Sequence, residues 1–305
     1  MRGQSTLRWI PEANCLECTN IGLCAGVGRC LREPTDAARV TAVARAVDYM
    51  IEHRAQPIQL VDVARAATMS QFHFHRIFRE ITCTTPARFL TALRMCEAQH
   101  LLLNSRRSVT EICSSVGYSS LGTFISQFGR LTGLSPRRFR TVVERIGQVP
   151  IQELTDLSGA MAERGPIGAV TSDRQERYCA LLGLYRTDRP WERPSAFQVI
   201  ETDHVVRIPP VSDGEYDTVS VGYSPVTTVA EVLGAPVGTL GRVGFGTRTL
   251  VARGGRSRHP FHVALRRQRR IDPPVEFSRP LLCLVTRANQ RDAAPALPTD
   301  AADRG

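Results

Sequence analysis

The sequence predicts a multidomain α + β protein, in which an all-α domain of two helix–turn–helix units precedes an all-β, sandwich-like domain. A helical pattern between residues 36 and 146 repeats with an offset of about fifty residues. Short strands take over in residues 177–288, beyond a Pro- and Gly-containing linker at 147–176. A Cys-rich segment, residues 1–35, comes first, and residues 289–305 are predicted to form a disordered tail.

Composition favours a soluble, cytoplasmic protein with a basic helical domain. The chain has 305 residues, 42% of them apolar, and a formal charge of +10; it contains no lysine, so all 39 basic residues are arginines. Between Asp36 and Arg145 stand 15 arginines against 8 acidic residues, an excess typical of nucleic-acid binding; a solvated arginine surface is the alternative. No apolar run approaches the ~20 residues that span a bilayer, and no secretory signal pattern is present, so no membrane partner is expected.

Four cysteines crowd into the N-terminal segment. Their spacing is C-x2-C-x5-C-x5-C, formed by Cys15, Cys18, Cys24 and Cys30. Thiolates gathered in a glycine-containing loop suit a tetrahedral zinc ion or an iron–sulfur cluster. Free or redox-active thiols and a poorly ordered tail remain the alternatives, because the second C-x2-C of a zinc ribbon is missing.

The first unit is predicted to contain a short helix over Leu60–Thr68, a turn ending at Ser70, and a longer helix over Gln71–Ile81. A preceding packing helix ends near His53. In the longer helix, i, i+3, i+4, i+7 spacing turns Phe74, Ile77, Phe78 and Ile81 toward the core. The outer face then carries Gln71, Phe72, His75, Arg76 and Arg79.

The second unit follows a long helix, Ala87–Asn104, whose 18 residues span about 27 Å. It starts with a capping box, Ser108-x-x-Glu111, and turns at Gly117. Its second helix has an inner stripe of Phe124, Phe128 and Leu131. Its outer face carries Leu121, Gly122, Thr123, Ser126, Gln127 and Arg130.

Corresponding residues of the two units lie fifty positions apart. The matched pairs are Phe74 and Phe124, Phe78 and Phe128, and Pro86 and Pro136. Ala64 matches Cys113 with an offset of forty-nine, so the second turn holds one extra residue, and Cys113 is predicted to be a core filler rather than a redox sensor. Cys83 stands where the second unit has Gly133, at a helix end that favours glycine by about 1 kcal/mol.

These residues resemble the DNA-binding domain of AraC/XylS family transcription regulators over about residues 41–145. The motif residues are Leu60 to Ala64, Ser70, Phe74, Phe78, Thr85-Pro86, Arg94, Ala98, Glu111-Ile112, Gly117-Tyr118, Phe124, Phe128, Gly133 and Ser135-Pro136 to Arg140. The resemblance implies seven helices and two recognition helices that enter adjacent major-groove segments. It also implies double-stranded DNA and RNA polymerase as partners, with an effector that is an unknown small molecule.

Carried over by position, the base-reading residues of the first recognition helix are Phe72, His75 and Arg76. Arg76 would form bidentate hydrogen bonds with guanine, His75 would donate to an acceptor, and Phe72 would pack on a thymine methyl or a sugar. Arg79 at the helix end would meet phosphate. In the second helix, Leu121, Gly122, Thr123 and Ser126 are short or apolar, so this helix is expected to supply backbone contacts and shape fit, with Gln127 and Arg130 as further candidates.

The C-terminal half is predicted to form a small sandwich of about seven strands that senses a ligand or mediates association. The predicted strands are 179–185, 196–201, 204–208, 216–224, 248–254, 261–266 and 280–286. The segment Ile208–Val221, with its Pro-Pro and Asp-Gly turn, is similar to prealbumin-like sandwich domains. A helix over Ile151–Arg164 is expected in the linker, and the run Arg266, Arg267, Arg269 and Arg270 is expected to be a solvated edge.

The leading interpretation is a sequence-specific transcription regulator and not an enzyme, because no phosphate loop, nucleophile elbow or catalytic set is visible. One alternative is a regulator gated by metal or redox chemistry at the N-terminal cysteines. Another is a DNA alkyl-acceptor hybrid, in which one of these thiolates takes a methyl group from damaged DNA. The cysteine cluster is too short to contain the domain that such chemistry requires.

Overall fold

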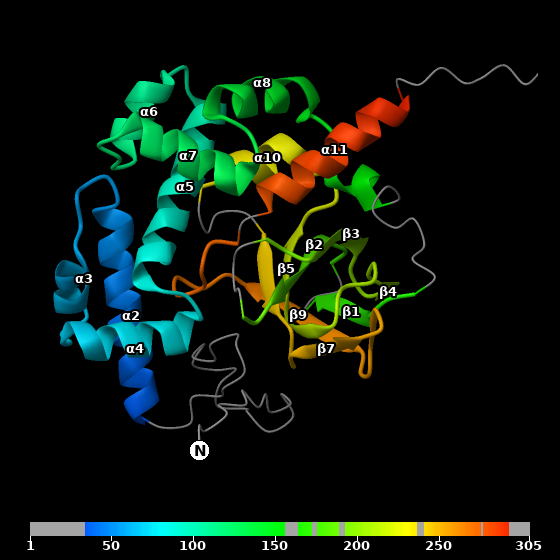
Figure 1. Ribbon diagram of the computed structural model, residues 1–305, viewed down its shortest axis with the longest axis horizontal. Coiled ribbons are helices and arrows are strands. Elements are labelled where there is room, and N and C mark those ends of the chain that lie inside the picture. The colour runs from blue at the N-terminus through cyan, green and yellow to red at the C-terminus, as the bar shows by residue number, and fades with distance from the viewer. Residues whose placement is uncertain are drawn as a thin grey trace, which may run out of the picture.

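The computed structural model describes residues 34–155, 164–172, 176–188, 193–236, 241–275 and 277–292, and shows a helical domain joined to a strand-rich domain (Figure 1). This confirms the predicted α + β architecture. The helical domain comprises α2 (Pro34–Glu52), α3 (Leu60–Ala66), α4 (Gln71–Thr82), α5 (Pro86–Asn104), α6 (Val109–Ser115), α7 (Leu121–Thr132) and α8 (Pro136–Ile146). No helix of the described residues is long and apolar enough to cross a membrane.

The helix–turn–helix units are α3–α4 and α6–α7, and α5 connects them (Figure 1). The predicted inner stripe of α4 is buried, with Phe74, Ile77 and Phe78 fully inaccessible to solvent. The 19 residues of α5 give a rod of about 28 Å, comparable with one turn of DNA at about 34 Å. α5 therefore sets the separation of the two units.

The duplication extends to the packing geometry. In the first unit Phe78 lies 5.3 Å from Phe74 and 5.5 Å from Phe89, edge to face with the latter. In the second unit Phe128 lies 5.9 Å from Phe124 and 5.3 Å from Phe139, again edge to face. Each helix then ends in a left-handed residue, Cys83 (φ 56°) or Gly133 (φ 82°). The predicted strained position of Cys83 is confirmed.

The turns between the paired helices differ in length as predicted. Four residues separate α3 from α4, whereas five separate α6 from α7. The second turn uses Gly117 at φ 85°, where an added Cβ would lie 2.6 Å from the Arg54 carbonyl oxygen. The first turn places Thr68 in the left-handed region at φ 56°. Glycine at position 117 is thus required both by the backbone angle and by the close approach of Arg54.

The strand-rich domain is one barrel-like sheet of nine strands in the order β3-β2-β5-β6-β9-β1-β4, with β7 and β8 extending from β5. β1 and β9 pair in parallel, and the other pairs are antiparallel. The strands are β1 (Ile167–Ser172), β2 (Cys179–Arg186), β3 (Ala196–Glu201), β4 (Val205–Arg207), β5 (Gly214–Tyr223), β6 (Arg242–Phe245), β7 (Leu250–Arg253), β8 (Arg256–Ser257) and β9 (Phe261–Arg267). β2 is buried on both faces, which explains its unbroken apolar sequence.

Two predicted segments have a different secondary structure. The strand predicted at 280–286 is part of a helix, α11 (Ser278–Asp292), whose Leu281, Leu282 and Val285 are buried as one helical stripe. A short apolar run does not distinguish a buried strand from a buried helix by periodicity alone. The predicted linker, 147–176, contains β1, so the sheet begins ten residues before the expected boundary of 177.

Other elements were not predicted or are shorter than expected. A six-residue helix, α10 (Val229–Gly234), follows β5. The helix expected over Ile151–Arg164 is a 3-10 helix, η2 (Ile151–Leu154), within the described residues, and positions 156–163 lie outside them. The predicted strand-rich character of this domain is confirmed. The parallel pairing of β1 with β9 and the helices α10 and α11 were not part of the predicted sandwich.

The arginine run at the end of β9 is only partly a solvated edge: Arg267 and Arg270 are exposed as predicted, whereas Arg266 and Arg269 are half-buried. Arg266 donates two hydrogen bonds to the buried carboxylate of Asp272, at 2.7 and 2.8 Å. Arg270 forms an ion pair with Asp48 of α2. The segment between β9 and α11 therefore ties the sheet to the first unit.

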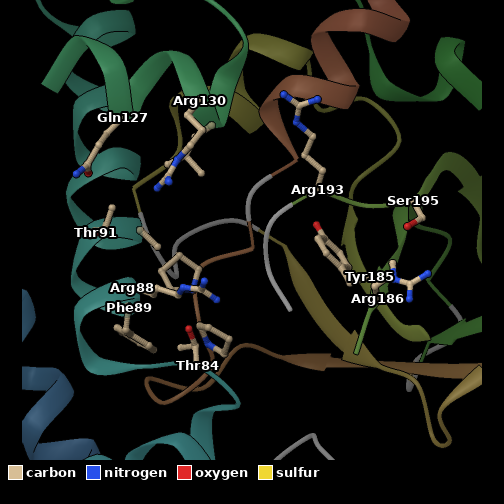
Figure 2. A pocket seen from close by; sticks show the side chains of 14 residues that line it. Thr84, Arg88, Phe89, Thr91, Gln127, Arg130, Tyr185, Arg186, Arg193 and Ser195 are labelled. Atoms are coloured by element: carbon tan, nitrogen blue, oxygen red, sulfur yellow. The ribbon is translucent and has the colours of Figure 1, made fainter. Parts of the chain in front are cut away.

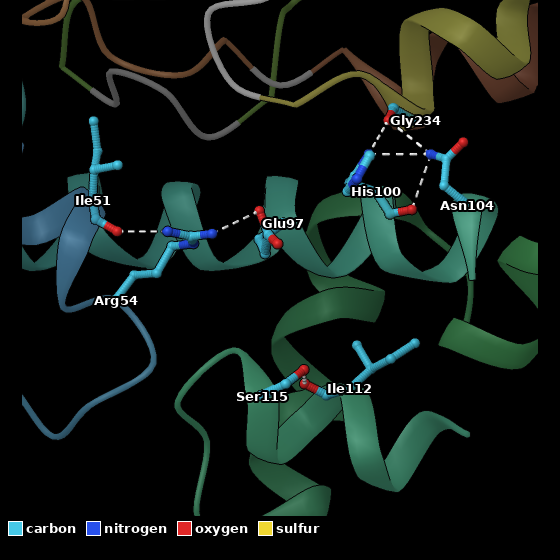
Figure 3. A network of polar contacts seen from close by, with 8 residues as sticks. All are labelled: Ile51, Arg54, Glu97, His100, Asn104, Ile112, Ser115 and Gly234. Atoms are coloured by element: carbon cyan, nitrogen blue, oxygen red, sulfur yellow. Dashed lines mark hydrogen bonds and ion pairs between the residues drawn. The ribbon is translucent and has the colours of Figure 1, made fainter. Parts of the chain in front are cut away.

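The second unit and the strand-rich domain share one hydrophobic core. Phe128 belongs to the same buried cluster as Val229 of α10, Leu281 of α11 and Leu181 of β2. Helices α10 and α11 lie between the unit and the sheet (Figure 1). His100 and Asn104 of α5 place nitrogen atoms 2.7 and 3.0 Å from the Gly234 carbonyl oxygen, which fixes α10 on α5 (Figure 3).

Candidate nucleic-acid interface

The outer face of α4 presents the side chains predicted from the sequence. Ser70 occupies the N-cap position without a side-chain capping bond, and one face of the first two turns is open to solvent. Gln71, Phe72, Arg76 and Arg79 are exposed, and His75 is half-buried. Phe72 is 92% exposed, so its ring is available to a partner.

Arg76 is held loosely on this face. Its guanidinium lies 3.7 Å from the Glu80 carboxylate and 3.5 Å from the His73 ring nitrogen, and its side chain is 63% exposed. An exposed ion pair of this kind contributes at most about 1 kcal/mol, so a phosphate or a guanine edge can replace Glu80 as the partner. Arg76 is thus both oriented and available.

The corresponding face of α7 carries no charge in its first two turns. Leu121, Gly122, Thr123 and Ser126 are exposed as predicted, and beside Gly122 an added Cβ would contact only Ser120, at 3.9 Å. Sequence reasoning missed Ile125, which is 38% exposed next to Leu121 at 39%. The available signal was the i, i+4 spacing of these two apolar residues outside the inner stripe.

The remaining α7 candidates, Gln127 and Arg130, line a cavity between the helical and strand-rich domains. The Gln127 side-chain oxygen accepts a hydrogen bond of 2.7 Å from the Tyr118 hydroxyl. Burial raises the pKa of Tyr118, so its phenol keeps the proton that it donates. Gln127 therefore has a structural role in the second turn.

Two arginines hold the units against the preceding segments. Arg94 of α5 donates to the carbonyl oxygens of Arg54 and Gln56, at 2.8 and 2.7 Å. Arg140 of α8 donates to those of Leu102 and Arg107, both at 2.7 Å. Burial lowers the pKa of Arg94 from its usual value. Arg54 itself donates to the Ile51 carbonyl oxygen and pairs with Glu97 at 3.2 Å (Figure 3).

The predicted capping box begins α6. The Ser108 backbone N–H donates to the Glu111 carboxylate at 2.7 Å, and the Glu111 N–H donates to the Ser108 hydroxyl at 3.2 Å. The first of these bonds is the main reason that the pKa of Glu111 lies below its usual value. The box fixes the start of the helix that supports α7.

The predicted zinc or iron–sulfur site lies outside the described residues. Cys15, Cys18, Cys24 and Cys30 all precede residue 34, so metal binding there stays a prediction. Among the described residues, no group of three or more His, Cys, Asp or Glu side chains is placed to hold a metal ion.

Cys113 and Cys179 should react much more slowly with iodoacetamide than Cys283 does. Both are buried, and burial raises the pKa of Cys113 and, together with the Glu201 carboxylate, that of Cys179 to about 11. At pH 8 about one Cys179 thiol in a thousand is then a thiolate, and the labelling rate should rise with pH up to about pH 11. Peptide mass spectrometry after timed alkylation measures these rates, with urea-unfolded protein as the control. Equal rates in the folded chain would mean that these thiols are accessible and reactive.

The fold and the exposed faces define a double helix-turn-helix DNA-binding domain. A helix-turn-helix domain family matches residues 63–141. The chain is also similar to a solved transcriptional regulator with an AraC-type DNA-binding domain from Chromobacterium violaceum, which is 26% identical, covers 34% of this chain and 94% of that chain, and gives a TM-score of 0.33. The transcriptional activator RhaS of Escherichia fergusonii is 34% identical over 94 residues, which are 31% of this chain and 34% of RhaS. The raffinose operon regulator RafR of Pediococcus pentosaceus is 32% identical over 95 residues, again 31% of this chain and 34% of the relative.

A solved structure also aligns with the helical domain. The DNA-binding domain of the global transcriptional factor AdpA, in complex with a target DNA, is 31% identical, covers 34% of this chain and 94% of that domain, and gives a TM-score of 0.33. The chain spans about a third of the length of the curated relatives it matches. The family match covers none of the sheet.

Proposed function

We propose that this chain is a sequence-specific DNA-binding transcription regulator in which α4 reads bases and α7 supplies shape fit. The observation that carries the proposal is the contrast between two duplicated faces. The α4 face exposes Phe72 and Arg76, whereas the α7 face exposes Leu121, Gly122 and Ile125. Arginine gives bidentate contacts to guanine, while short and apolar side chains fit against thymine methyls and the sugar wall of the groove.

RNA polymerase and a small-molecule effector are proposed as further partners. RhaS is a transcriptional activator by name, and activators of transcription act on the polymerase. The strand-rich domain supports the proposal of an effector. Because this domain shares a hydrophobic core with the second unit, a ligand bound to the sheet could change the position of that unit. The relatives are regulators, which supports a role without catalysis.

Replacing Arg76 by alanine should weaken operator binding by about 1–3 kcal/mol, roughly 5- to 150-fold, and relax the preference at one base pair. The loss is expected because a bidentate arginine–guanine contact has no substitute on the α4 face. Fluorescence anisotropy against a duplex selected from a random pool, and against its single-base variants, measures both effects at a fixed salt concentration.

Ser126→Ala is the matched control, because Ser126 lies fifty residues after Arg76 on the same face of the second unit. Its effect should stay below about threefold. Arg253→Ala on β7, an exposed charge in the sheet, controls for net charge alone. Equal losses in the Arg76 and Ser126 variants, with no base pair relaxed, would rule out base reading by α4.

A further inference from the structure

A cavity of about 650 Å³ lies between the helical domain and the sheet. Its walls come from α5 and α7 on one side and from β2, the segment before β3 and the segment after β9 on the other. Figure 2 shows Arg88 and Arg130 entering the space from the helices, while Tyr185, Arg193 and Ser195 lie on the opposite side. Binding sites for small organic molecules occupy about 300–1,000 Å³, so the volume suits one such ligand.

The polar part of this wall is strongly basic. Arg88, Arg130 and Arg193 come from three different elements, and no carboxylate is among the described lining residues. A fourth arginine, Arg186, is neutralised by two hydrogen bonds to Asp188, at 2.8 and 3.1 Å, and its guanidinium points away from the other arginines (Figure 2). Arg130 and Arg193 are exposed to solvent, so an anion that enters the open cavity can reach their guanidinium groups.

The rest of the wall mixes apolar side chains with the polar side chains of Thr84, Thr91, Gln127 and Ser195. Leu131 and Ala92 are half-buried and line the cavity, whereas Phe89 and Tyr185 leave only 1% and 3% of their surfaces exposed. Aliphatic side chains such as those of Leu131 and Ala92 suit the apolar part of an organic molecule. The two kinds of wall together specify an amphipathic ligand.

We propose that this cavity binds an amphipathic organic anion, whose carboxylate, sulfonate or phosphate group pairs with Arg130 and Arg193 and whose apolar body packs against Leu131 and Ala92. The inference rests on the proposed function, since it supplies the effector class of the regulator. Arg130 lies on the last turn of the helix whose first turns face DNA, so the ligand joins α7 to the sheet. By thermodynamic linkage, if the ligand changes the affinity for DNA by some factor, DNA changes the affinity for the ligand by the same factor.

The test compares an anion with a neutral molecule that has the same aryl body. The full chain is titrated with 8-anilinonaphthalene-1-sulfonate and with N-phenyl-1-naphthylamine, and fluorescence reports binding of each. We expect one saturable site for the sulfonate. Arg193→Gln and Arg130→Gln should each weaken sulfonate binding at least tenfold, because each removes a charge-assisted hydrogen bond.

The controls separate charge recognition from folding. Arg258→Gln removes an exposed arginine that does not line the cavity, and it should change the sulfonate affinity less than twofold. Binding of the neutral amine should be the same in all variants, which shows that the apolar wall is intact. Unchanged sulfonate affinity in Arg193→Gln, or equal affinity for the two probes in the unaltered chain, overturns the inference. DNA binding by the unaltered chain without a probe reports separately on the proposed function.

Discussion

Phe128→Ala should lower the free energy of unfolding by about 3–5 kcal/mol and loosen the sheet as well as the second helix-turn-helix unit. Phe128 is fully buried and packs edge to face on Phe139, within the cluster that continues through α11 to Leu181 of β2. Removing its ring opens a cavity in a core that both domains use. Hydrogen exchange measured by mass spectrometry should therefore show faster exchange in α7, α8, α11 and β2 together.

The duplication provides a matched control in Phe78→Ala. Phe78 has the same aromatic neighbours in the first unit, 5.3 Å from Phe74 and 5.5 Å from Phe89, but belongs to a separate cluster. A loss of similar size is expected, with faster exchange confined to α2–α5. If Phe128→Ala speeds exchange in α7 and leaves β2 unchanged, the second unit and the sheet do not unfold as one body.

Local periodicity predicted the helical domain well, because the signals that specify it lie within a few residues of one another. The stripe of Phe74, Ile77 and Phe78 is buried, and the left-handed positions of Gly117 and Cys83 occur where the helix ends require them. β1 was missed for the opposite reason. Ile167, Val170 and Thr171 favour a strand, but Gly165, Pro166 and Gly168 favour a linker. The parallel pairing of Ile167–Ser172 with β9, about ninety residues later, decides for the strand.

The same distinction between local and long-range signals applies to the candidate site. The exposure of Phe72 and Arg76 follows from the helical spacing of their buried neighbours, so the sequence predicted it, while their contact with DNA stays a prediction. The surroundings of Gln127 and Arg130 depend on where Tyr118 and the sheet lie. No local pattern encodes the approach of β2 and Arg193 to α7, so the cavity could not be predicted.

Asp272→Ala should also cost about 3–5 kcal/mol of stability, because it leaves a largely buried cation without its partner. The Asp272 carboxylate accepts hydrogen bonds from the Arg266 guanidinium, at 2.7 and 2.8 Å, and from the Arg269 backbone N–H, at 2.6 Å. Asp272 is 5% exposed. Urea unfolding followed by circular dichroism gives the change in free energy. Asp188→Ala, which breaks the exposed bidentate pair with Arg186, is the control and should cost no more than about 1 kcal/mol.

The consequences of Asp272→Ala should extend beyond stability, because the segment that this carboxylate holds touches three parts of the molecule. Ile271 packs into the core of the first unit, and Pro274 lies in the cavity wall. The segment then leads into α11, which packs against α7 of the second unit. The double variant Arg266→Met, Asp272→Ala removes the unpaired cation and should recover part of the lost stability. If the single and double variants are equally unstable, the ion pair is not the interaction that holds this segment, and the backbone bond from Arg269 becomes the better explanation.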